Sequence, residues 1–259
     1  MIKNKISVII PTRLRLKLLK TALKSVLKQT EKPFEIIVVD DASDKKVLKY
    51  IKNLKRNTKI RILYIARKDY KENSSPESIN LGFKKSKSEF LAILDDDDYW
   101  KKNYLKECKK IIKKENCHLI ISPINNIYKK KKIFVRKVPA IFNLQDWLTY
   151  NPGLICSNIF IKARAFRKIG MLDGNLPYSA DRDLMIRLNL KKYKYVVLKN
   201  PLVNYTNSVH PFKSKKAEIY TKSNLRFYKK HYSSMTFNSH LINMKKLIMG
   251  KIFNFLKGF

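Results

Sequence analysis

The chain has 259 residues, of which 44% are hydrophobic and 11% aromatic. This composition excludes a disordered or fibrous chain and provides enough apolar side chains for a large core. Lysine and arginine number 57 against 20 aspartates and glutamates, which gives a formal net charge of +37. Such a positive charge favours anionic partners, namely nucleotides, nucleic acid or an anionic membrane surface.

The cysteines and the first residues indicate the compartment. Cys108, Cys117 and Cys156 form neither a C-x-x-C pair nor an even-numbered framework. We therefore expect a reducing compartment, with each cysteine a packing residue and not a nucleophile. The opening MIKNKISVIIPT has only a short apolar stretch before Pro11, which is not typical of a signal peptide. No apolar run in the sequence reaches the length of a membrane-spanning helix, so we predict a cytoplasmic protein.

The first hundred residues alternate between short apolar runs and helical patterns. Continuous apolar runs predict buried strands, and apolar residues three or four apart predict helices. We expect Pro11 to end the first strand. Apolar strands that alternate with helices indicate a parallel sheet covered on both faces. In chain order, strands are predicted at 6–10, 36–39, 60–66 and 90–94, and helices at 16–27, 47–54 and 79–85.

The second half of the chain is less regular. A strand is predicted at 118–124, SNIFIKARAFRKIGML predicts a strand that runs into a short helix, and DRDLMIRLNL predicts a helix. From Lys213 onward the chain is basic and helical in pattern. Two interpretations of this tail stay open, an interfacial helix on anionic lipid or a helix packed on the domain or a partner. Its apolar residues lie three or four apart: Leu241, Met244, Ile248, Ile252, Phe255 and Phe259.

Carboxylates cluster at two of the predicted strand ends. Asp40 and Asp41 follow the second strand, and four consecutive aspartates, 95–98, follow the strand at 90–94. In parallel α/β sheets, ligands bind beyond the carboxyl ends of the strands. Four neighbouring negative charges repel each other, and a bound divalent cation would relieve that repulsion. An exposed acidic turn without a metal is the alternative.

The glycines exclude the common phosphate-binding loops. None of the six glycines falls in a G-x-G-x-x-G or G-x-x-x-x-G-K-[ST] pattern, and PTRLRLK follows the first strand. Carboxylates bind phosphate only through a divalent metal, so we predict carboxylate–metal–phosphate bridging. In an extended segment, Asp95 and Asp97 would point to one side and Asp96 and Asp98 to the other, so only part of the cluster can bind one ion.

Several segments, in this order, resemble family 2 glycosyltransferases, which have the GT-A fold. The resemblance extends from Ile6 to about Tyr205 and implies a Rossmann-like α/β domain, with a mostly parallel sheet flanked by helices. It implies inverting transfer of a sugar from a nucleotide-sugar, commonly a uridine diphosphate sugar, with Mn²⁺ or Mg²⁺. The segments are ISVIIPT, LLKTALKSVLKQT, FEIIVVDDASD, INLGFKKSKSEFLAILDDDDYW and NPGLICSNIFIKARAFRKIGMLDGNLPYSADRDLMIRL.

The resemblance also implies a domain division and donor-site residues. A GT-A domain at 1–205 would have its nucleotide-sugar half at 1–100 and its acceptor half at 101–205, before a basic helical tail at 206–259. The loop that borders the base matches Pro11, Thr12 and Arg13, although the family commonly has an aromatic residue where Arg13 stands. Arginine can also stack on a ring. Asp41 matches the residue that hydrogen-bonds the base, and Asn80 lies in the helix beneath the diphosphate.

The four aspartates match the family's D-x-D motif. The resemblance places Asp95 and Asp96 near the ribose and the metal, and Asp97 is the expected metal ligand. Asp181 matches the catalytic base, a carboxylate that removes the proton from the acceptor hydroxyl. A helix N-cap is the alternative role for Asp181. His210 falls where some relatives have a metal-contacting histidine, with a surface histidine as the alternative.

Two other classes of function compete with sugar transfer. A nucleotidyltransferase would carry a glycine-rich basic loop after its first strand, which this chain lacks. A nucleic-acid binder is suggested by the charge, but no recognition motif is present and an acidic centre repels phosphate. We therefore predict a glycosyltransferase and no nucleic-acid partner. The expected acceptor is a surface-glycan precursor such as lipooligosaccharide, capsule or a lipid-linked saccharide, with peripheral contact to the inner face of the membrane left open.

Overall fold

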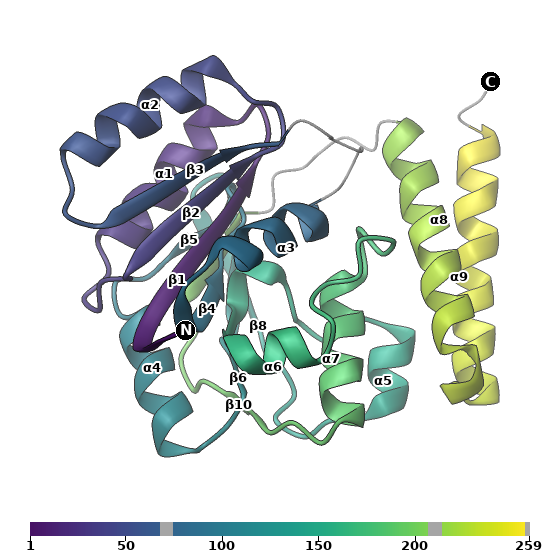
Figure 1. Ribbon diagram of the computed structural model, residues 1–259. Helices are drawn as coiled ribbons and strands as arrows, with labels where there is room; N and C mark the ends of the chain where they lie inside the picture. The colour runs from purple at the N-terminus through teal and green to yellow at the C-terminus, as the bar shows by residue number, and fades with distance from the viewer. Residues whose placement is uncertain (68–74, 207–213, 257–259) are drawn as a thin grey trace.

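The computed structural model describes residues 1–67, 75–206 and 214–256 (Figure 1). Its strands are β1 (Ile2–Thr12), β2 (Glu35–Asp40), β3 (Arg61–Ala66), β4 (Ser88–Ile93), β5 (Tyr99–Trp100), β6 (Leu119–Ile121), β7 (Ile124–Tyr128), β8 (Lys131–Arg136), β9 (Ile159–Lys162), β10 (Tyr195–Val197) and β11 (Val203–Thr206). Its helices are α1 (Leu16–Leu27), α2 (Lys45–Arg56), α3 (Ser75–Lys85), α4 (Tyr104–Lys114), α5 (Leu144–Thr149), α6 (Ala163–Lys168), α7 (Ala180–Leu190), α8 (Ser214–His231) and α9 (Phe237–Leu256), with short 3₁₀ turns at Cys156–Asn158 and Tyr232–Ser234.

The described strands form two sheets. The larger one has seven strands in the order β10-β6-β9-β4-β1-β2-β3, and all its pairs are parallel except those that β9 makes with β4 and β6. The smaller one has four strands in the order β5-β11-β7-β8. The larger sheet confirms the predicted mostly parallel α/β arrangement, and it places the ends of β1, β2 and β4 side by side.

Helices cover both faces of the larger sheet. Successive side chains of a strand point to opposite faces, and here both sets are apolar, so each face forms its own core beneath helices. Ile9 and Ile37 contribute to the core beneath α3, α5, α6 and α7, whereas Val8 and Val38 contribute to the core beneath α1, α2 and α4. A strand that is buried on both faces is apolar at every position, which is why the runs in β1, β2 and β4 are continuous.

Most predicted elements have their expected positions, with two corrections. Pro11 does not end the first strand, since β1 continues through Pro11 and Thr12 beside Val39 and Asp40. Pairing with β4 ends at Ile9, so the missing amide of Pro11 interrupts no ladder on that side. The strand predicted at 118–124 is broken at residues 122–123 into β6 and β7, which belong to different sheets.

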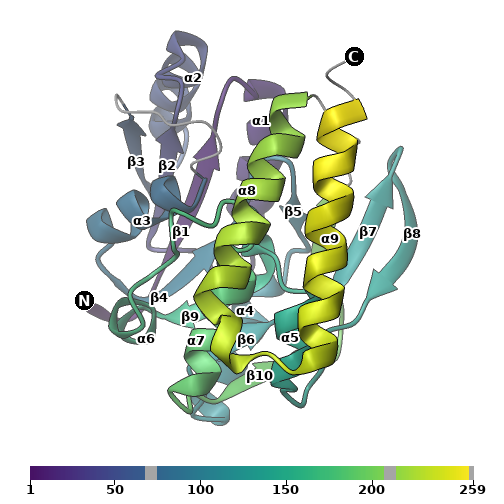
Figure 2. The ribbon, with the colours of Figure 1, turned by 90° about the vertical axis from the view of Figure 1, so that its right-hand side faces the viewer.

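Helices α8 and α9 lie side by side against α5 and α7 (Figure 2). Asn243 of α9 donates to the carbonyl of Leu148 at 3.0 Å, and the guanidinium of Arg182 on α7 lies 3.7 Å from the ring centre of Phe227 on α8. The helical tail is therefore packed on the rest of the chain. In the described residues, no helix is both long enough and apolar enough to cross a membrane.

Asp183 of α7 links this helix to α8 through Lys230 and His231. Its carboxylate is fully buried and pairs with Arg187 at 2.7 Å, Lys230 at 2.8 Å and His231 at 3.0 Å. Burial alone would raise the pKa of Asp183, but His231, Arg187 and Lys230 prevail and lower the pKa to about 2. The ionised carboxylate thus stabilises the folded chain.

Replacing Asp183 with Asn should lower the free energy of unfolding by about 3 kcal/mol, because it removes the buried carboxylate that Arg187, Lys230 and His231 contact. In the native chain this contribution is complete above the pKa of an unfolded aspartate, about 4. It is lost as the pH falls towards the folded pKa of about 2. Urea denaturation at pH 7 and pH 3 measures both effects.

Asp173→Asn is the matched control, since Asp173 also pairs with Lys230 at 2.7 Å but its side chain is 23% exposed. This variant should lose less than about 1 kcal/mol. Equal losses in the two variants at pH 7 would contradict the role given to Asp183.

Candidate active site

A cleft of about 560 Å³ lies beyond the carboxyl ends of β1, β2 and β4. It is bounded on one side by the β1–α1 loop and on the other by the start of α7. Of the residues predicted for the site, the cleft brings together Pro11, Thr12, Arg13, Asp41, Asp95, Asp97 and Asp181. These residues lie far apart in the sequence, and the parallel strand order is what makes their ends meet.

The four aspartates after β4 divide into two pairs, as the alternation predicts. Asp95 and Asp97 line the cleft, whereas Asp96 and Asp98 are buried. Asp98 accepts a hydrogen bond from the amide of Thr206 at 2.9 Å, which links the cluster to the end of β11. Asp98 is therefore a structural residue, and the cluster offers two carboxylates to the cleft.

Arg15 forms ion pairs with two carboxylates of the aspartate cluster. Its guanidinium lies 2.6 Å from Oδ1 of Asp96 and 2.9 Å from Oδ2 of Asp97. The hydroxyl of Thr12 donates to Oδ2 of Asp96 at 2.6 Å. Burial lowers the pKa of Arg15, but the charges of the aspartates outweigh it and raise the pKa, so Arg15 stays protonated.

The carboxylates remain incompletely compensated despite Arg15. Burial raises the pKa of Asp95 to about 7, and the charges of Asp97 and Asp96 add to this effect. Burial also raises the pKa of Asp96 to about 6, against the opposing influence of Arg15 and Thr12. The pKa of Asp98 is raised for the same reason. A further cation in the cleft would stabilise this cluster.

The carboxylates fit a metal that also binds phosphate. The described part of the chain contains no group of three His, Cys, Asp or Glu side chains that could hold a metal ion by itself. Mg²⁺ sites that bind phosphate need only one or two carboxylates, with water and phosphate oxygens as the other ligands. Asp97, with Asp95 beside it, meets this requirement at the cleft surface. An ion there would compete with Arg15 for Asp97.

Asp41 lies at the end of β2 and lines the cleft. It accepts a hydrogen bond from Ser78 of α3, and Arg67 lies 3.5 Å from its Oδ1 atom. Burial raises the pKa of Asp41, although Ser78 and Arg67 counteract it. Its neighbour Asp40 points into the structure, where it accepts hydrogen bonds from Tyr64 and two backbone amides.

Asp181 lies in the first turn of α7 and lines the cleft. The N-cap residue of α7 is Ser179, so the alternative role of Asp181 as the N-cap is wrong. Asn151 donates to Oδ2 of Asp181 at 3.3 Å, and the amide of Arg182 donates to Oδ1 at 2.7 Å. Burial raises the pKa of Asp181 to about 6, which suits a base that works near neutral pH.

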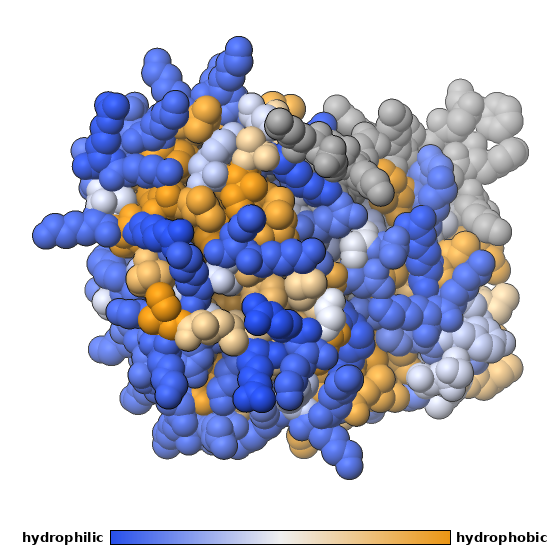
Figure 3. Space-filling model, viewed as in Figure 1, coloured by the Kyte–Doolittle hydropathy of each residue, from blue (hydrophilic) through white to orange (hydrophobic). Residues whose placement is uncertain are grey.

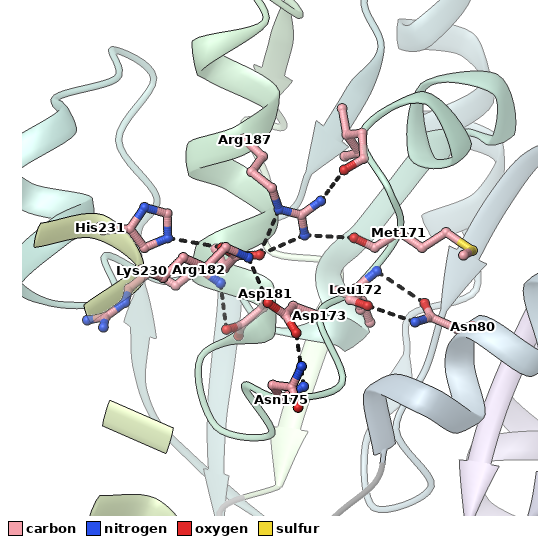
Figure 4. Close-up of polar contacts among 12 residues, drawn as sticks. Asn80, Met171, Leu172, Asp173, Asn175, Asp181, Arg182, Arg187, Lys230 and His231 are labelled. Carbon is pink, nitrogen blue, oxygen red and sulfur yellow. Dashed lines mark hydrogen bonds and ion pairs between the residues drawn. The ribbon is translucent and has the colours of Figure 1, made fainter. Parts of the chain in front are cut away.

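Asn80 and Asp96, which were predicted for the site, do not line the cleft. Asn80 uses both amide atoms on the backbone of Leu172, at 2.7 Å and 3.1 Å, and so connects α3 to the segment before α7 (Figure 4). Asp96 is fully buried against Thr12 and Arg15. Both therefore support the cleft from beneath. His210 lies outside the described residues.

Sequence reasoning missed Arg15, Ser157 and Asn151. Arg15 follows Arg13 by two residues, and the pattern PTRLR alone does not indicate which arginine faces the aspartates. Ser157 accepts from the amide of Asp95 at 3.0 Å, and Asn151 contacts Asp181. Ser157 lies in a short 3₁₀ turn and Asn151 in a loop, so no spacing or periodicity could have identified them.

A family model decides the classification. Residues 7–170 match the model described as Glycosyl transferase family 2. The chain belongs to glycosyl transferase family 2. The match covers the two aspartate-bearing strand ends, and Asp181 lies beyond it.

Curated relatives agree with this family. The chain is 36% identical over 113 residues to an uncharacterized glycosyltransferase from Rickettsia bellii, an alignment that covers 43% of this chain and 16% of that protein. It is 39% identical over 94 residues to the GalNAc(5)-diNAcBac-PP-undecaprenol beta-1,3-glucosyltransferase of Campylobacter jejuni, covering 36% of this chain and 30% of that protein. The chain thus spans less than a third of the length of these relatives.

Solved structures confirm the predicted GT-A fold. S. aureus TarS 1–349 in complex with UDP-GlcNAc superposes with a TM-score of 0.65 and 18% identity, over 86% of this chain and 66% of TarS. The mannosyltransferase PcManGT from Pyrobaculum calidifontis, in complex with GDP-Man and Mn²⁺, has a TM-score of 0.66 and 13% identity, over 96% of this chain and 73% of that one.

Proposed function

We propose that this protein is an inverting glycosyltransferase. It moves one sugar from a nucleotide-sugar, with UDP as the expected nucleotide, to a hydroxyl of a surface-glycan precursor. The observation that carries this proposal is a single cleft with Asp41, Asp95 and Asp97 at the strand ends and Asp181 on the opposite helix. The UDP-GlcNAc bound by TarS and the GDP-Man bound by PcManGT support a nucleotide-sugar donor.

On the donor side, Asp41 accepts a hydrogen bond from the base, and the β1–α1 loop with Pro11, Thr12 and Arg13 borders it. Mn²⁺ or Mg²⁺ held by Asp97, with Asp95 beside it, would neutralise the charge that develops on the departing diphosphate. Arg15 is placed to position Asp97 and, as a permanent cation, to contribute to the same neutralisation. Asp96 and Asn80 hold these groups in position without contacting the donor.

On the acceptor side, Asp181 removes the proton from the attacking hydroxyl. Its pKa of about 6 leaves it ionised at pH 7 and still basic enough to accept a proton. Asn151 and the amide of Arg182 orient the carboxylate. The C. jejuni relative is named for an undecaprenyl diphosphate-linked acceptor, which supports a lipid-linked saccharide as the acceptor here. We assign donor binding to 1–100 and acceptor binding to 101–205.

Helix α9 is the proposed contact with the cytoplasmic face of an anionic membrane. Its packed side carries the buried polar residues Ser239 and Asn243, whereas several of its apolar side chains are exposed. In Figure 3, hydrophobic side chains lie among hydrophilic ones over the α8–α9 pair. An exposed apolar stripe beside many lysines fits an anionic lipid surface. Five of the apolar side chains of α9 are 45% to 61% exposed: Leu241, Ile242, Met244, Ile248 and Met249.

Asp97→Asn tests the metal assignment. The variant should lose the thermal stabilisation that Mn²⁺ and UDP together give the native chain, because the aspartate cluster then presents only Asp95 to the cleft. Sugar transfer should fall by at least about 100-fold, which corresponds to the several kcal/mol that a metal contributes to charge stabilisation. Glu31→Gln, which removes a surface ion pair with Lys109, should change neither property. Unchanged stabilisation by Mn²⁺ and UDP in the Asp97 variant would refute the assignment.

Asp181→Asn tests the catalytic base. This variant should bind UDP and Mn²⁺ normally and lose transfer by about 10²- to 10⁴-fold, since only proton removal is affected. In the native chain, kcat should rise with pH around an inflection near 6 and then level off. The Asn variant should lack this inflection in its residual activity. Turnover equal to that of the native chain would exclude Asp181 as the base.

Vesicle sedimentation tests the membrane contact. The native chain should sediment with phosphatidylglycerol vesicles more than with phosphatidylcholine vesicles, and added salt should reduce the binding. The double variant Met244→Ser and Ile248→Ser should weaken binding several-fold, because each side chain loses an apolar contact with the bilayer. Ile141→Ser, which removes an apolar side chain that is 86% exposed elsewhere, is the control. Equal sedimentation of the two variants would show that α9 is not the contact.

A further inference from the structure

A second cavity, of about 250 Å³, lies between the start of α7 and the α8–α9 pair. It adjoins the proposed active site, because Tyr178 lines both hollows and Asn151, another of its lining residues, contacts Asp181. Tyr220 of α8 and Lys246 of α9 close its other side. The helical tail is thus part of a cavity beside the catalytic carboxylate, and not only an appendage.

Two cations converge in this cavity without a carboxylate partner among the described residues. Lys246 and Nη1 of Arg182 both donate to the carbonyl oxygen of Thr149. Arg182 is only 7% exposed, and its Nε atom has no hydrogen-bond partner in the regions that the structure describes. No ion pair within the described parts of the chain involves either residue. The buried guanidinium of Arg182 and the more exposed ammonium of Lys246 therefore share one neutral acceptor.

The nearby acids do not compensate this charge. Asp181 and Asp183 attract the guanidinium of Arg182 from α7, but burial outweighs them and lowers its pKa to about 10. Asp183 is already engaged by Arg187, Lys230 and His231. Burial and the charge of Arg182 also lower the pKa of Lys246. An anion in the cavity would offset the desolvation cost of Arg182 and the repulsion between the two cations.

The remaining wall suits a sugar. Tyr150, Tyr178 and Tyr220 are 38% to 49% exposed, and the rings of Tyr178 and Tyr220 meet edge to face at 5.5 Å. Exposed tyrosines offer an apolar ring face together with a hydroxyl. A sugar ring likewise has an apolar face of C–H groups and hydroxyls at its edge, so the two surfaces are complementary. A phosphate and a single sugar ring fit the size of the cavity better than a long chain does.

We propose that this cavity binds a phosphate ester carried by the acceptor, with Arg182 and Lys246 as its anion-binding residues and the tyrosines against the adjoining sugar. The inference rests on the proposed function, because it names the chemical class of acceptor that Asp181 deprotonates. Tyr178 lines both the cavity and the cleft. A phosphorylated saccharide bound in the cavity would therefore extend its sugar past Tyr178 into the cleft. The tail then determines which acceptors enter.

Calorimetric titration of the full chain in EDTA tests this site without the metal. The probes are N-acetylglucosamine 1-phosphate, N-acetylglucosamine and inorganic phosphate. The phosphosugar should bind more tightly than either single component, because only it fills both parts of the cavity. Lys246→Gln should weaken phosphosugar binding about tenfold, which is the usual worth of one charge-assisted hydrogen bond. Tyr220→Ala should weaken the phosphosugar but not inorganic phosphate.

Lys245→Gln is the matched control, since it removes the same charge from the next residue of α9, which does not line the cavity. It should bind the phosphosugar as the native chain does. Equal weakening in the two lysine variants would show attraction to the net charge alone and would overturn the proposal. So would equal affinity of the native chain for the sugar with and without phosphate.

A separate measurement distinguishes this inference from the proposed function. Thermal stabilisation by UDP and Mn²⁺ reports only the donor cleft. If that stabilisation is absent while phosphosugar binding depends on Lys246, the cavity exists but the proposed function fails. If the stabilisation is present and phosphosugar binding is the same in the native chain and the Lys246 variant, the cavity assignment alone is wrong.

Discussion

The packing of four aspartates at the end of a buried strand is the constraint on which the site depends. Near the low-dielectric core their charges repel, and the backbone separates them into two inward and two outward carboxylates. Arg15 and Thr12 hold Asp96, and the amide of Thr206 holds Asp98. Asp95 and Asp97 are left at the cleft with a charge that Arg15 only partly balances. A site of this kind favours a cation together with the diphosphate that the cation binds.

A second charge imbalance, of opposite sign, lies on the other side of Asp181. Arg182 and Lys246 are cations without carboxylate partners in the described regions, and they face a small cavity. The molecule therefore places an excess of negative charge where a metal–diphosphate would bind and an excess of positive charge where a phosphorylated acceptor would bind. The buried carboxylate of Asp183 contacts Lys230 and His231, attaches α8 to α7 and so keeps the cavity wall in position.

Much of this arrangement could be predicted from local patterns. Continuous apolar runs identified β1, β2 and β4, and the aspartates at the ends of β2 and β4 identified the cleft. Pro11 misled because a strand that lacks a partner on one side tolerates proline. Asn80 and Asp96 matched family positions, but only the folded structure shows that Asn80 contacts Leu172 and that Asp96 contacts Thr12 and Arg15. The packing of α9 could not be foreseen, because buried Ser239 and Asn243 reverse the usual polarity of a packed helix.

The central claim is that Asp97, with Asp95 beside it, holds a divalent ion and the diphosphate of the donor. Anomalous scattering from crystals grown with Mn²⁺ and UDP measures this most directly. We expect a manganese peak in the cleft within coordination distance of Asp97, about 2.0–2.3 Å for a hard divalent ion with oxygen ligands, and in contact with the diphosphate. Nucleotide bound in the cleft with no manganese beside it, and Asp97 still paired with Arg15, would contradict the account.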